Sequence, residues 1–339
     1  MAEEAGDPRE VKWHPRNART LLGHLDAEKR MRLAFESGKL HHAWLISGPK
    51  GIGKATLAYR FAGFVLANDR TFSDDLGIDP NSRTAHWLAS RSHPDLFVLE
   101  RRWDSKTKKL KTELAVDDAR QLSEFFGLTA GGGGWRVAII DAADDLNTAS
   151  ANALLKLIEE PPPKCLLLLV CNQPGRLLRT IRSRCMRIDL TPLALEETRS
   201  VLAHLPLDEP PTPEALEITV NLAGGSPGRG LDLLDSAGAK SFAAFRAMAK
   251  LGSVSLVEFG NRFGSRTSTT DDFETFFDLL EDWVGRDARR AGLAGGGREM
   301  ADAYTAIGHS IRQTNALNLD RRQAVINALS LITEATKTA

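Results

Sequence analysis

The chain has 339 residues, of which 42% are hydrophobic and 26% charged, a composition typical of globular proteins and a length sufficient for roughly two or three domains. Its 44 basic side chains equal its 44 acidic ones, so the net charge of zero gives no overall electrostatic reason to bind nucleic acid. We expect no membrane span and no secretory signal, because no apolar run reaches about 18 residues and the first residues are charged rather than apolar.

Up to residue 190 the sequence alternates short apolar runs with segments of helical spacing. The predicted strands cover residues 44–47, 95–99, 137–141, 166–171 and 186–190. The predicted helices cover residues 20–39, 54–67, 116–126, 147–160 and 177–181. The remaining segments are read as a flexible arm over 1–16, polar turns over 68–92, a basic hairpin loop over 101–111 and a flexible glycine link over 131–134. This alternation predicts a parallel sheet covered by helices on both faces.

After residue 191 the strand signals stop and helices follow one another. Three are predicted over 195–205, 213–222 and 227–236, and a mostly helical block runs from about 241 to the end. The change near 191 and the break at 236–240 predict the domain boundaries. We therefore expect an α/β nucleotide-binding-like domain over 1–190, a small three-helix domain over 191–238 and a helical domain over 239–339.

The most informative stretch is a glycine-rich loop at residues 45–56, which an apolar strand enters and a helix leaves. Gly48, Gly53 and Lys54 have the spacing of a P-loop, and Gly51 adds a further glycine. The glycines let successive N–H groups point at phosphate oxygens, and the following helix presents its positive dipole end there. Lys54 would reach the β- and γ-phosphates. The loop is therefore predicted to hold a nucleotide's phosphates, against the simpler interpretation of a turn that binds nothing.

The positions that would bind Mg²⁺ and activate water lack the side chains that these roles need. Ala55 stands where a P-loop carries the hydroxyl that holds Mg²⁺. Thr56 remains a candidate nucleotide contact but cannot simply replace that hydroxyl, because one helical step turns a side chain by roughly 100°. Asp141 ends a strand where P-loop ATPases bind Mg²⁺, unless it is an ordinary strand-end carboxylate, and Ala142 cannot act as a base. We predict weak binding of ATP or ADP, loosely held Mg²⁺ and little hydrolysis.

Arg184 stands out in a basic stretch just before the last predicted strand, within the triplet Ser183-Arg184-Cys185. A guanidinium is a planar, permanently charged fork that suits phosphate, and such an arginine delivered in trans can accelerate nucleotide hydrolysis greatly. The alternative is a solvated basic helix face. From spacing alone, the solvated face is the favoured interpretation.

Together these motifs resemble the AAA+ clamp-loader subunits and, within them, the delta-prime subunits of bacterial DNA polymerase III. The matching segments are 22–24, 42–45, 48–54, 152–162, 183–185 and 225–229. The run over 152–162 with the Ser-Arg-Cys triplet downstream is the most specific of them. The resemblance covers about residues 20–235, and the rest of the chain matches only in being helical.

The resemblance implies an α/β P-loop AAA+ domain with a parallel sheet, followed by a small helical lid and an all-α C-terminal collar. It also implies a largely non-hydrolysing member of a hetero-pentamer with gamma/tau motor subunits and a delta subunit, which loads a sliding clamp on primed DNA. In such a pentamer, the resemblance implies that Arg184 reaches the ATP of a neighbouring motor subunit. Asn172 matches a sensor position. Arg229 lies near the lid sensor arginine but is offset by one, because Gly228 occupies the usual position.

One departure from relatives concerns zinc, which many of them hold with four cysteines after the P-loop helix. Residues 68–92 contain no cysteine, so we expect no zinc. The cysteines present, Cys165, Cys171 and Cys185, lack metal-ligand spacing and suit a reducing cytoplasm. Two other functions stay open: an active AAA+ motor subunit, which Ala55 and Ala142 disfavour, and an unrelated P-loop kinase, which the Ser-Arg-Cys triplet disfavours.

Overall fold

The computed structural model describes residues 10–68, 70, 74–101, 103–104, 109–110, 114, 116–127, 134–208, 210–250, 255–263, 270–293, 296–317 and 319–338. The chain divides into two compact units, residues 1–210 with 223–229, and residues 211–222 with 230–339. No helix in the described ranges is both long and apolar enough to cross a membrane. The division into three domains remains a prediction.

The first unit is built on a parallel five-stranded sheet with the order β2-β5-β6-β1-β7. Its strands are β1 (Ala43–Ser47), β2 (Leu96–Glu100), β5 (Arg136–Asp141), β6 (Cys165–Cys171) and β7 (Met186–Asp189). Every neighbouring pair is parallel, and β1 and β6 are buried along their whole length. Continuous apolar strands are typical of a sheet that is covered on both faces.

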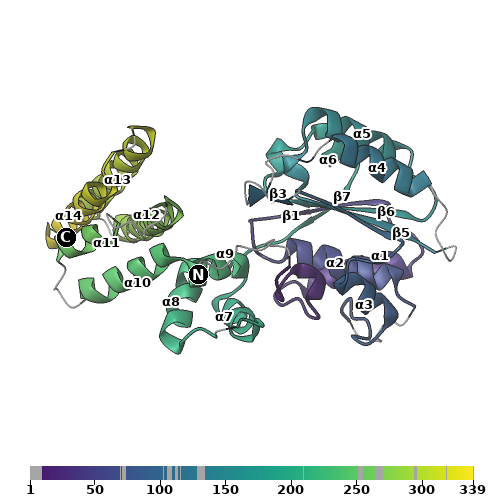
Figure 1. Ribbon diagram of the computed structural model, residues 1–339, viewed down its shortest axis with the longest axis horizontal. Helices are drawn as coiled ribbons and strands as arrows, with labels where there is room; N and C mark the ends of the chain where they lie inside the picture. Colours follow the sequence, from purple (N-terminus) through teal and green to yellow (C-terminus); the bar gives the residue numbers. More distant parts are fainter. Residues whose placement is uncertain are drawn as a thin grey trace. The chain divides into compact units, whose positions relative to one another are not determined.

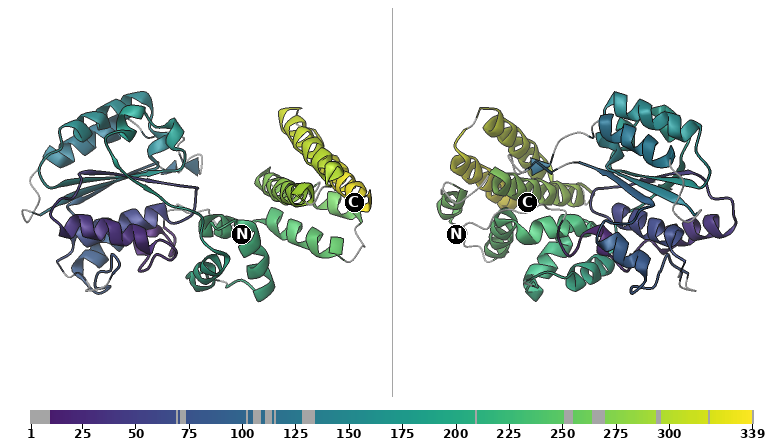
Figure 2. Two further views of the ribbon diagram at one scale, coloured as in Figure 1. Left: turned by 180° about the vertical axis from the view of Figure 1, so that it is seen from behind. Right: turned by 45° about the vertical axis from the view of Figure 1, so that its right-hand side comes forward.

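Helices cover both faces of this sheet, as Figures 1 and 2 show. One face carries α1 (Leu25–Glu36), α2 (Lys54–Leu66) and α3 (Arg83–Ala89), and the other carries α4 (Val116–Gly127), α5 (Thr148–Glu159) and α6 (Arg179–Arg182). Alternate strand residues feed two separate cores, with Trp44 and Ile46 in one and Ala43 and Leu45 in the other. The predicted three-layer α/β architecture is confirmed.

Shorter elements complete the first unit. They are the 3-10 turns η1 (Pro15–Asn17), η2 (Ala143–Asp145) and η3 (Pro174–Arg176), the antiparallel pair β3 (Trp103–Asp104) and β4 (Lys109–Leu110), and α7 (Leu195–His204). The pair β3 and β4 agrees with the hairpin expected over 101–111. The glycine link over 131–134 lies outside the described residues except for Gly134.

The second unit is helical throughout its described residues. Its helices are α8 (Pro213–Ala223), α10 (Ala237–Lys250), α11 (Leu256–Phe263), α12 (Thr270–Leu293), α13 (Arg298–Leu317) and α14 (Arg321–Thr338), and α9 (Pro227–Asp235) joins the two units. Phenylalanines pack edge to face at its centre, for example Phe242 on Phe276 and Phe245 on Phe259. This is the all-α C-terminal region that the sequence predicts.

Three local predictions were wrong. The helix expected over 20–39 begins only at Leu25, because Gly23 adopts a left-handed φ of 79°. The segment 68–92 contains the helix α3, capped by Ser82, whose hydroxyl accepts a hydrogen bond from the N–H of Ala85. The described part of the expected N-terminal arm, from residue 10 onward, is held against the unit by Arg16, whose Nε donates to the carbonyl of Ala89 at 3.0 Å.

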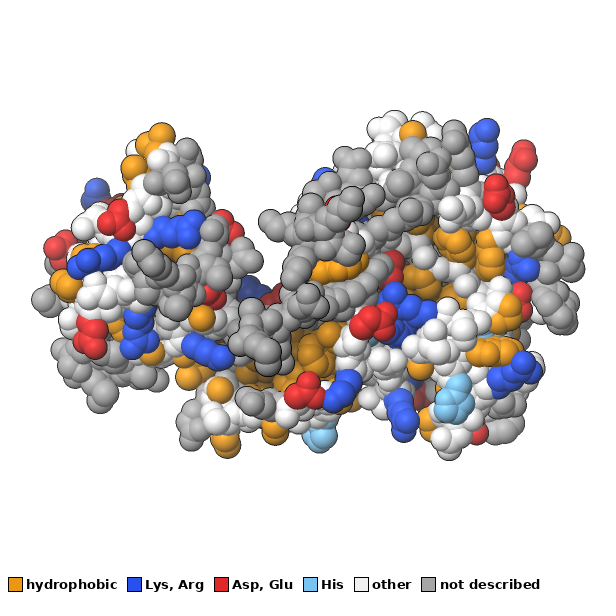
Figure 3. Space-filling model, viewed as in Figure 1, with side chains coloured by type: hydrophobic (Ala, Val, Ile, Leu, Met, Phe, Trp, Pro, Cys, Tyr) orange, Lys and Arg blue, Asp and Glu red, His pale blue; other side chains and the backbone are white. Residues whose placement is uncertain are grey.

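On the face seen in Figure 3, Lys and Arg side chains lie among Asp and Glu side chains rather than in one continuous basic area. Ion pairs such as Arg187–Asp189 also place opposite charges side by side on the surface. The visible face therefore agrees with the net charge of zero.

Candidate functional site

The glycine-rich loop joins the end of β1 to the start of α2 at the carboxyl edge of the sheet. Gly48 has a φ of 147°, and a Cβ there would lie 2.4 Å from the carbonyl oxygen of Leu190. Gly51 has a φ of 79°, and a Cβ there would lie 2.5 Å from Oγ of Ser226. Any other residue at these positions would be strained and would collide with the neighbouring chain, so the glycines are required by the fold of the loop.

The loop leaves its amides available for an anion. Among the described residues, the N–H groups of Gly51, Ile52 and Gly53 have no hydrogen-bond acceptor. Gly53 is the N-cap of α2, a helix of 13 residues, and no side chain caps that end. Unpaired amides and a positive helix end at one place form a phosphate cradle. The loop therefore fits the phosphates of a nucleotide.

Two further segments of the first unit hold the loop from outside. Ser226 donates its hydroxyl to the carbonyl of Lys50 at 2.8 Å, and the N–H of Gly228 donates to the carbonyl of Gly51 at 2.9 Å. On another side, Nε2 of the buried His24 lies 2.8 Å from the carbonyl of Ile52. These bonds use the carbonyls of the loop and leave its N–H groups free. They also place the main chain of Arg229, at the start of α9, beside the loop.

Lys54 is the charged group of the loop and is almost fully buried, with 4% of its surface exposed. Its ammonium group donates to the carbonyl of Pro49 at 2.5 Å. Burial lowers the pKa of Lys54 to about 8, although the nearby carboxylates of Asp141 and Asp144 oppose that shift. The buried cation is stabilised by few partners, so a phosphate group would relieve its desolvation.

This lowered pKa predicts that nucleotide binding weakens above about pH 8. A bound polyphosphate stabilises the ammonium form, so above that pH binding must be accompanied by uptake of a proton, and affinity is expected to fall by up to tenfold per pH unit. Below about pH 7 the lysine is protonated in free and bound states, and its contribution is constant. Calorimetry with ATP at about pH 7, 8 and 9 measures this dependence.

A Lys54→Arg variant is the control for that experiment. Its guanidinium stays charged across the range, so its affinity should not fall with pH in the same way. A wild-type affinity that stays constant between about pH 7 and 9 would contradict the assigned role of Lys54.

Asp141 lies at the end of β5, partly buried and close enough to Lys54 for the two charges to interact. Burial, assisted by the neighbouring charge of Glu100, raises the pKa of Asp141 to about 6. Glu100 is the register partner of Asp141 across the β2–β5 ladder. Lys54 and Asp141 are therefore brought together as the sequence predicts, and Glu100 is an additional acidic neighbour.

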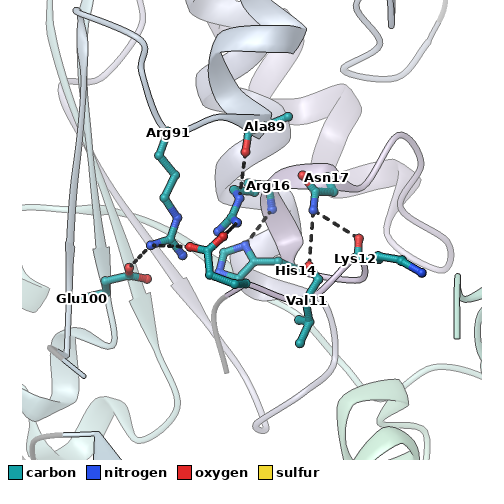
Figure 4. A network of polar contacts seen from close by, with 9 residues as sticks. Val11, Lys12, His14, Arg16, Asn17, Ala89, Arg91 and Glu100 are labelled. Carbon is teal, nitrogen blue, oxygen red and sulfur yellow. Dashed lines mark hydrogen bonds and ion pairs between the residues drawn. The ribbon is translucent and has the colours of Figure 1, made fainter. Parts of the chain in front are cut away.

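Glu100 belongs to a network that reaches the N-terminal segment, drawn in Figure 4. Nη1 of Arg91 lies 3.2 Å from Glu100 and 3.8 Å from Glu10, and Arg16 lies 3.0 Å from Glu10. Arg91 is thus the ion-pair partner of the carboxylate beside Asp141. Glu100 is engaged in this ion pair, which makes it a poor substitute for the base that Ala142 cannot supply.

Asn172 directly follows β6, and its backbone has a partner in the structure. The carboxylate of Asp144, in η2, accepts hydrogen bonds from the N–H groups of Asn172 at 3.0 Å and Gln173 at 3.2 Å. Asp144 is buried, with 8% of its surface exposed, and its charge also acts on Lys54. It therefore connects the end of β6 electrostatically to the phosphate loop.

The positions where a P-loop ATPase carries its Mg²⁺-binding hydroxyl and its water-activating base have neither side chain in this chain. Ala55 and Ala142 present methyl groups, and Thr56 lies half-buried on α2, one residue past the required position. Within the described ranges, no three of the His, Cys, Asp and Glu side chains form a group that could hold a metal ion. The residues present fit a phosphate better than they fit a Mg²⁺ ion, and the absence of zinc stays a prediction.

Arg184 does not join the phosphate loop. It precedes β7, whose partner in register is β1, with Trp44 opposite Met186 and Ser47 opposite Asp189. Because the strands are parallel, Arg184 lies at the amino edge of the sheet while the loop leaves the carboxyl edge, roughly 13 Å or more away. Its side chain is 43% exposed. Arg184 is therefore accessible from outside the chain, at the edge of the sheet opposite the phosphate loop.

Several residues around the sites escaped the sequence analysis. Asp144, Glu100 and Arg91 are charged groups whose neighbours lie far away in the sequence, so no local spacing reveals them. Ser226 was noted within a matching segment, but its hydrogen bond to the loop was not foreseen. A partial signal existed for Glu100, since it follows an apolar run as Asp141 does.

Comparison with known proteins places these features in context. The family model described as "DNA polymerase III, delta subunit" matches residues 23–194. DNA polymerase III subunit delta' of Pseudomonas aeruginosa is 38% identical over 186 residues, which are 55% of this chain and 53% of that protein. The Escherichia coli subunit delta' is 31% identical over 60% of this chain and 58% of its own length. The chain thus spans about half the length of these curated relatives.

Proteins named as gamma subunits match as well. DNA polymerase III subunit gamma of Buchnera aphidicola is 30% identical over 234 residues, which are 67% of this chain and 60% of that protein. A solved gamma subunit-related protein of Thermotoga maritima covers 92% of this chain and 99% of its own, with 18% identity and a TM-score of 0.45.

Proposed function

The chain belongs to the family described as DNA polymerase III, delta subunit, and from this premise we propose that it is the delta-prime subunit of a clamp loader. In this role it sits in the cytoplasm in a hetero-pentamer with gamma/tau motor subunits and a delta subunit. The complex places a sliding clamp on primed DNA. This chain contributes binding surfaces and an arginine for a neighbour, and it hydrolyses little or no ATP itself.

The observation that carries the proposal is that the phosphate loop and Arg184 lie apart, and that each by itself lacks groups needed for ATP hydrolysis. The phosphate loop has its cradle and Lys54 but lacks the hydroxyl at Ala55 and the carboxylate at Ala142. Loss of a metal ligand or a catalytic base commonly costs about two or more orders of magnitude in rate. Arg184 lies exposed at the other edge of the sheet. An arginine that cannot reach its own nucleotide is useful only to the nucleotide of another subunit.

The residues proposed for the nucleotide follow from the loop. The free N–H groups of Gly51, Ile52 and Gly53 and the ammonium of Lys54 would hold the phosphates, with Gly48 shaping the loop. Asp141 and Asn172, at the ends of β5 and β6, are proposed as further contacts. Thr56 and Arg229 are proposed as peripheral contacts, since Arg229 starts α9 beside Gly51. We propose ATP or ADP bound weakly, with Mg²⁺ not tightly held.

The test is reconstitution followed by turnover measurement. The isolated chain is expected to release phosphate at a background rate that changing Lys54 to alanine does not lower further. Mixed with gamma/tau and delta subunits, it should enter a stable complex that loads the clamp. Phosphate release at the rate of a motor subunit, abolished by Lys54→Ala, would instead identify the chain as an active ATPase. Failure to enter the complex would reject the proposal.

A further inference from the structure

Arg184 is held in a defined direction by two groups of its own chain. Its Nη1 donates to the carbonyl of Thr180 at 3.2 Å, and its Nη2 lies 3.1 Å from Oε1 of Glu159. A guanidinium carries five N–H donors in a fixed plane. These two contacts, one from each terminal nitrogen, therefore orient the guanidinium and leave further donors for a ligand.

The backbones that carry this pair are firmly supported. Nε2 of His42 lies 2.8 Å from the carbonyl of Ile158, which fixes the last turn of α5 beside Glu159. On the other side, Ser183 donates its hydroxyl to the carbonyl of Thr180 at 3.1 Å, and Cys185 packs against the core beneath α5 and α6. The two residues flanking Arg184 thus anchor it, and Glu159 projects from an equally fixed helix end.

Stability is a poor explanation for an acid at position 159. Glu159 is the last residue of α5, where the helix presents its negative dipole end, and a carboxylate there is unfavourable. Both partners are about half exposed, with 43% of the Arg184 side chain and 44% of the Glu159 side chain accessible. Exposed pairs of this kind contribute little to folding. The position favours a role for Glu159 in directing Arg184.

We propose that Glu159 is a positioning residue for Arg184, aiming its guanidinium at the nucleotide of a neighbouring subunit. The inference rests on the proposed function, because it requires a neighbour that hydrolyses ATP. An arginine stabilises a transition state only if its donors are in place before charge develops. Without Glu159, the guanidinium would keep its charge but occupy several directions.

The experiment uses the reconstituted complex with Glu159→Gln, Glu160→Gln or Arg184→Ala in this chain. Glu160→Gln is the matched control, because it removes the same charge from the same exposed helix end. Glu160 has no ion pair within the described residues. Glu159→Gln is expected to lower kcat of DNA-stimulated ATP hydrolysis by about 3- to 10-fold, with KM for ATP within about twofold. Glu160→Gln should match the wild type, and all variants should keep their melting temperature.

The double variant separates positioning from a general charge effect. Glu159→Gln combined with Arg184→Ala should be no slower than Arg184→Ala alone, because no arginine remains to be positioned. An unchanged or raised kcat for Glu159→Gln, in a complex where Arg184→Ala is slow, would overturn the positioning role and leave the proposed function intact. An unchanged rate for Arg184→Ala would reject both the arginine's role in trans and its positioning.

Discussion

Replacing Arg184 with alanine is expected to leave this chain folded and assembled, yet to slow ATP hydrolysis at the adjoining motor subunit by about 10³-fold. The side chain is exposed and contacts only Glu159 and the carbonyl of Thr180 among the described residues, so its removal leaves no buried group unpaired. An arginine delivered in trans neutralises the charge that spreads over the transferred phosphoryl group. Arg184→Lys should rescue poorly, because an ammonium keeps the charge but loses the planar fork.

The measurement is DNA-stimulated ATPase activity and clamp loading by the reconstituted complex. Arg182→Ala is the control variant, since it removes a basic side chain two residues away, from the last residue of α6. It should leave the rate close to that of the wild type. Full hydrolysis by an assembled Arg184→Ala complex would remove the role in trans and leave the chain an architectural subunit. A lowered melting temperature or failed assembly would point to a structural role instead.

Replacing Arg60 with alanine is expected to destabilise the chain by about 3–5 kcal/mol. Arg60 lies on α2 and is 5% exposed on its side chain, and its Nε lies 2.5 Å from the carboxylate of Glu28, which is 1% exposed. Its other nitrogens bond Asp75 at 3.2 Å and the carbonyl of Arg19. Removing the cation would strand the carboxylate of Glu28 in the core between α1 and α2, and an unpaired buried charge is costly.

The pH dependence of this loss has a definite sign. Burial raises the pKa of Glu28, and only Arg60 and a backbone N–H counter that shift appreciably. In Arg60→Ala the pKa should rise further, so the stability that depends on a protonated Glu28 is present at low pH and lost as pH rises through its folded-state pKa. The difference in the free energy of unfolding between Arg60→Ala and wild type should therefore become smaller at low pH. Urea denaturation at about pH 5 and pH 8 measures it.

Lys12→Ala is the matched control for Arg60. The Lys12–Asp208 pair has the same 2.5 Å separation as Arg60–Glu28, but its side chains are 67% and 80% exposed. Its loss should cost no more than about 1 kcal/mol. Equal losses of unfolding free energy in Lys12→Ala and Arg60→Ala would show that burial does not determine how much the Arg60–Glu28 pair contributes to stability. The double variant Glu28→Gln with Arg60→Met should recover much of the lost stability.

Local signals in the sequence predicted the central part of the fold well. Each strand of the parallel sheet is a short, continuous apolar run, and each run is flanked by residues that end it. These runs alone therefore predicted the ends of the strands to within a residue or two. The helix within the segment 68–92 was not predicted from local signals. Its helix α3 spans only Arg83–Ala89 and depends on a cap at Ser82 and on packing, as where Leu88 contacts the Gly63 position of α2. Short helices carry too few turns for helical spacing to stand out.

The chemistry of the phosphate loop was determined by the sequence itself. A loop that needs glycine at Gly48 and Gly51, a lysine at its end and a hydroxyl after that lysine is read directly from consecutive residues, and so is the alanine at Ala55. The left-handed φ values of these glycines and the free amides are the geometry that such a spacing predicts. Local backbone geometry follows from local residues, since steric limits act between neighbours in the chain.

Only the tertiary structure decided which charges meet. Arg60 and Glu28 are 32 residues apart, and the pairing of Arg184 with Glu159 joins the segment after α6 to the end of α5. No local pattern predicts such pairs, because they depend on how α1 packs on α2 and α5 on α6. The parallel order of the sheet likewise decided that Arg184 lies at the edge opposite the phosphate loop. The sequence thus determined which side chains each proposed site contains, and packing determined which groups support them and which way they face.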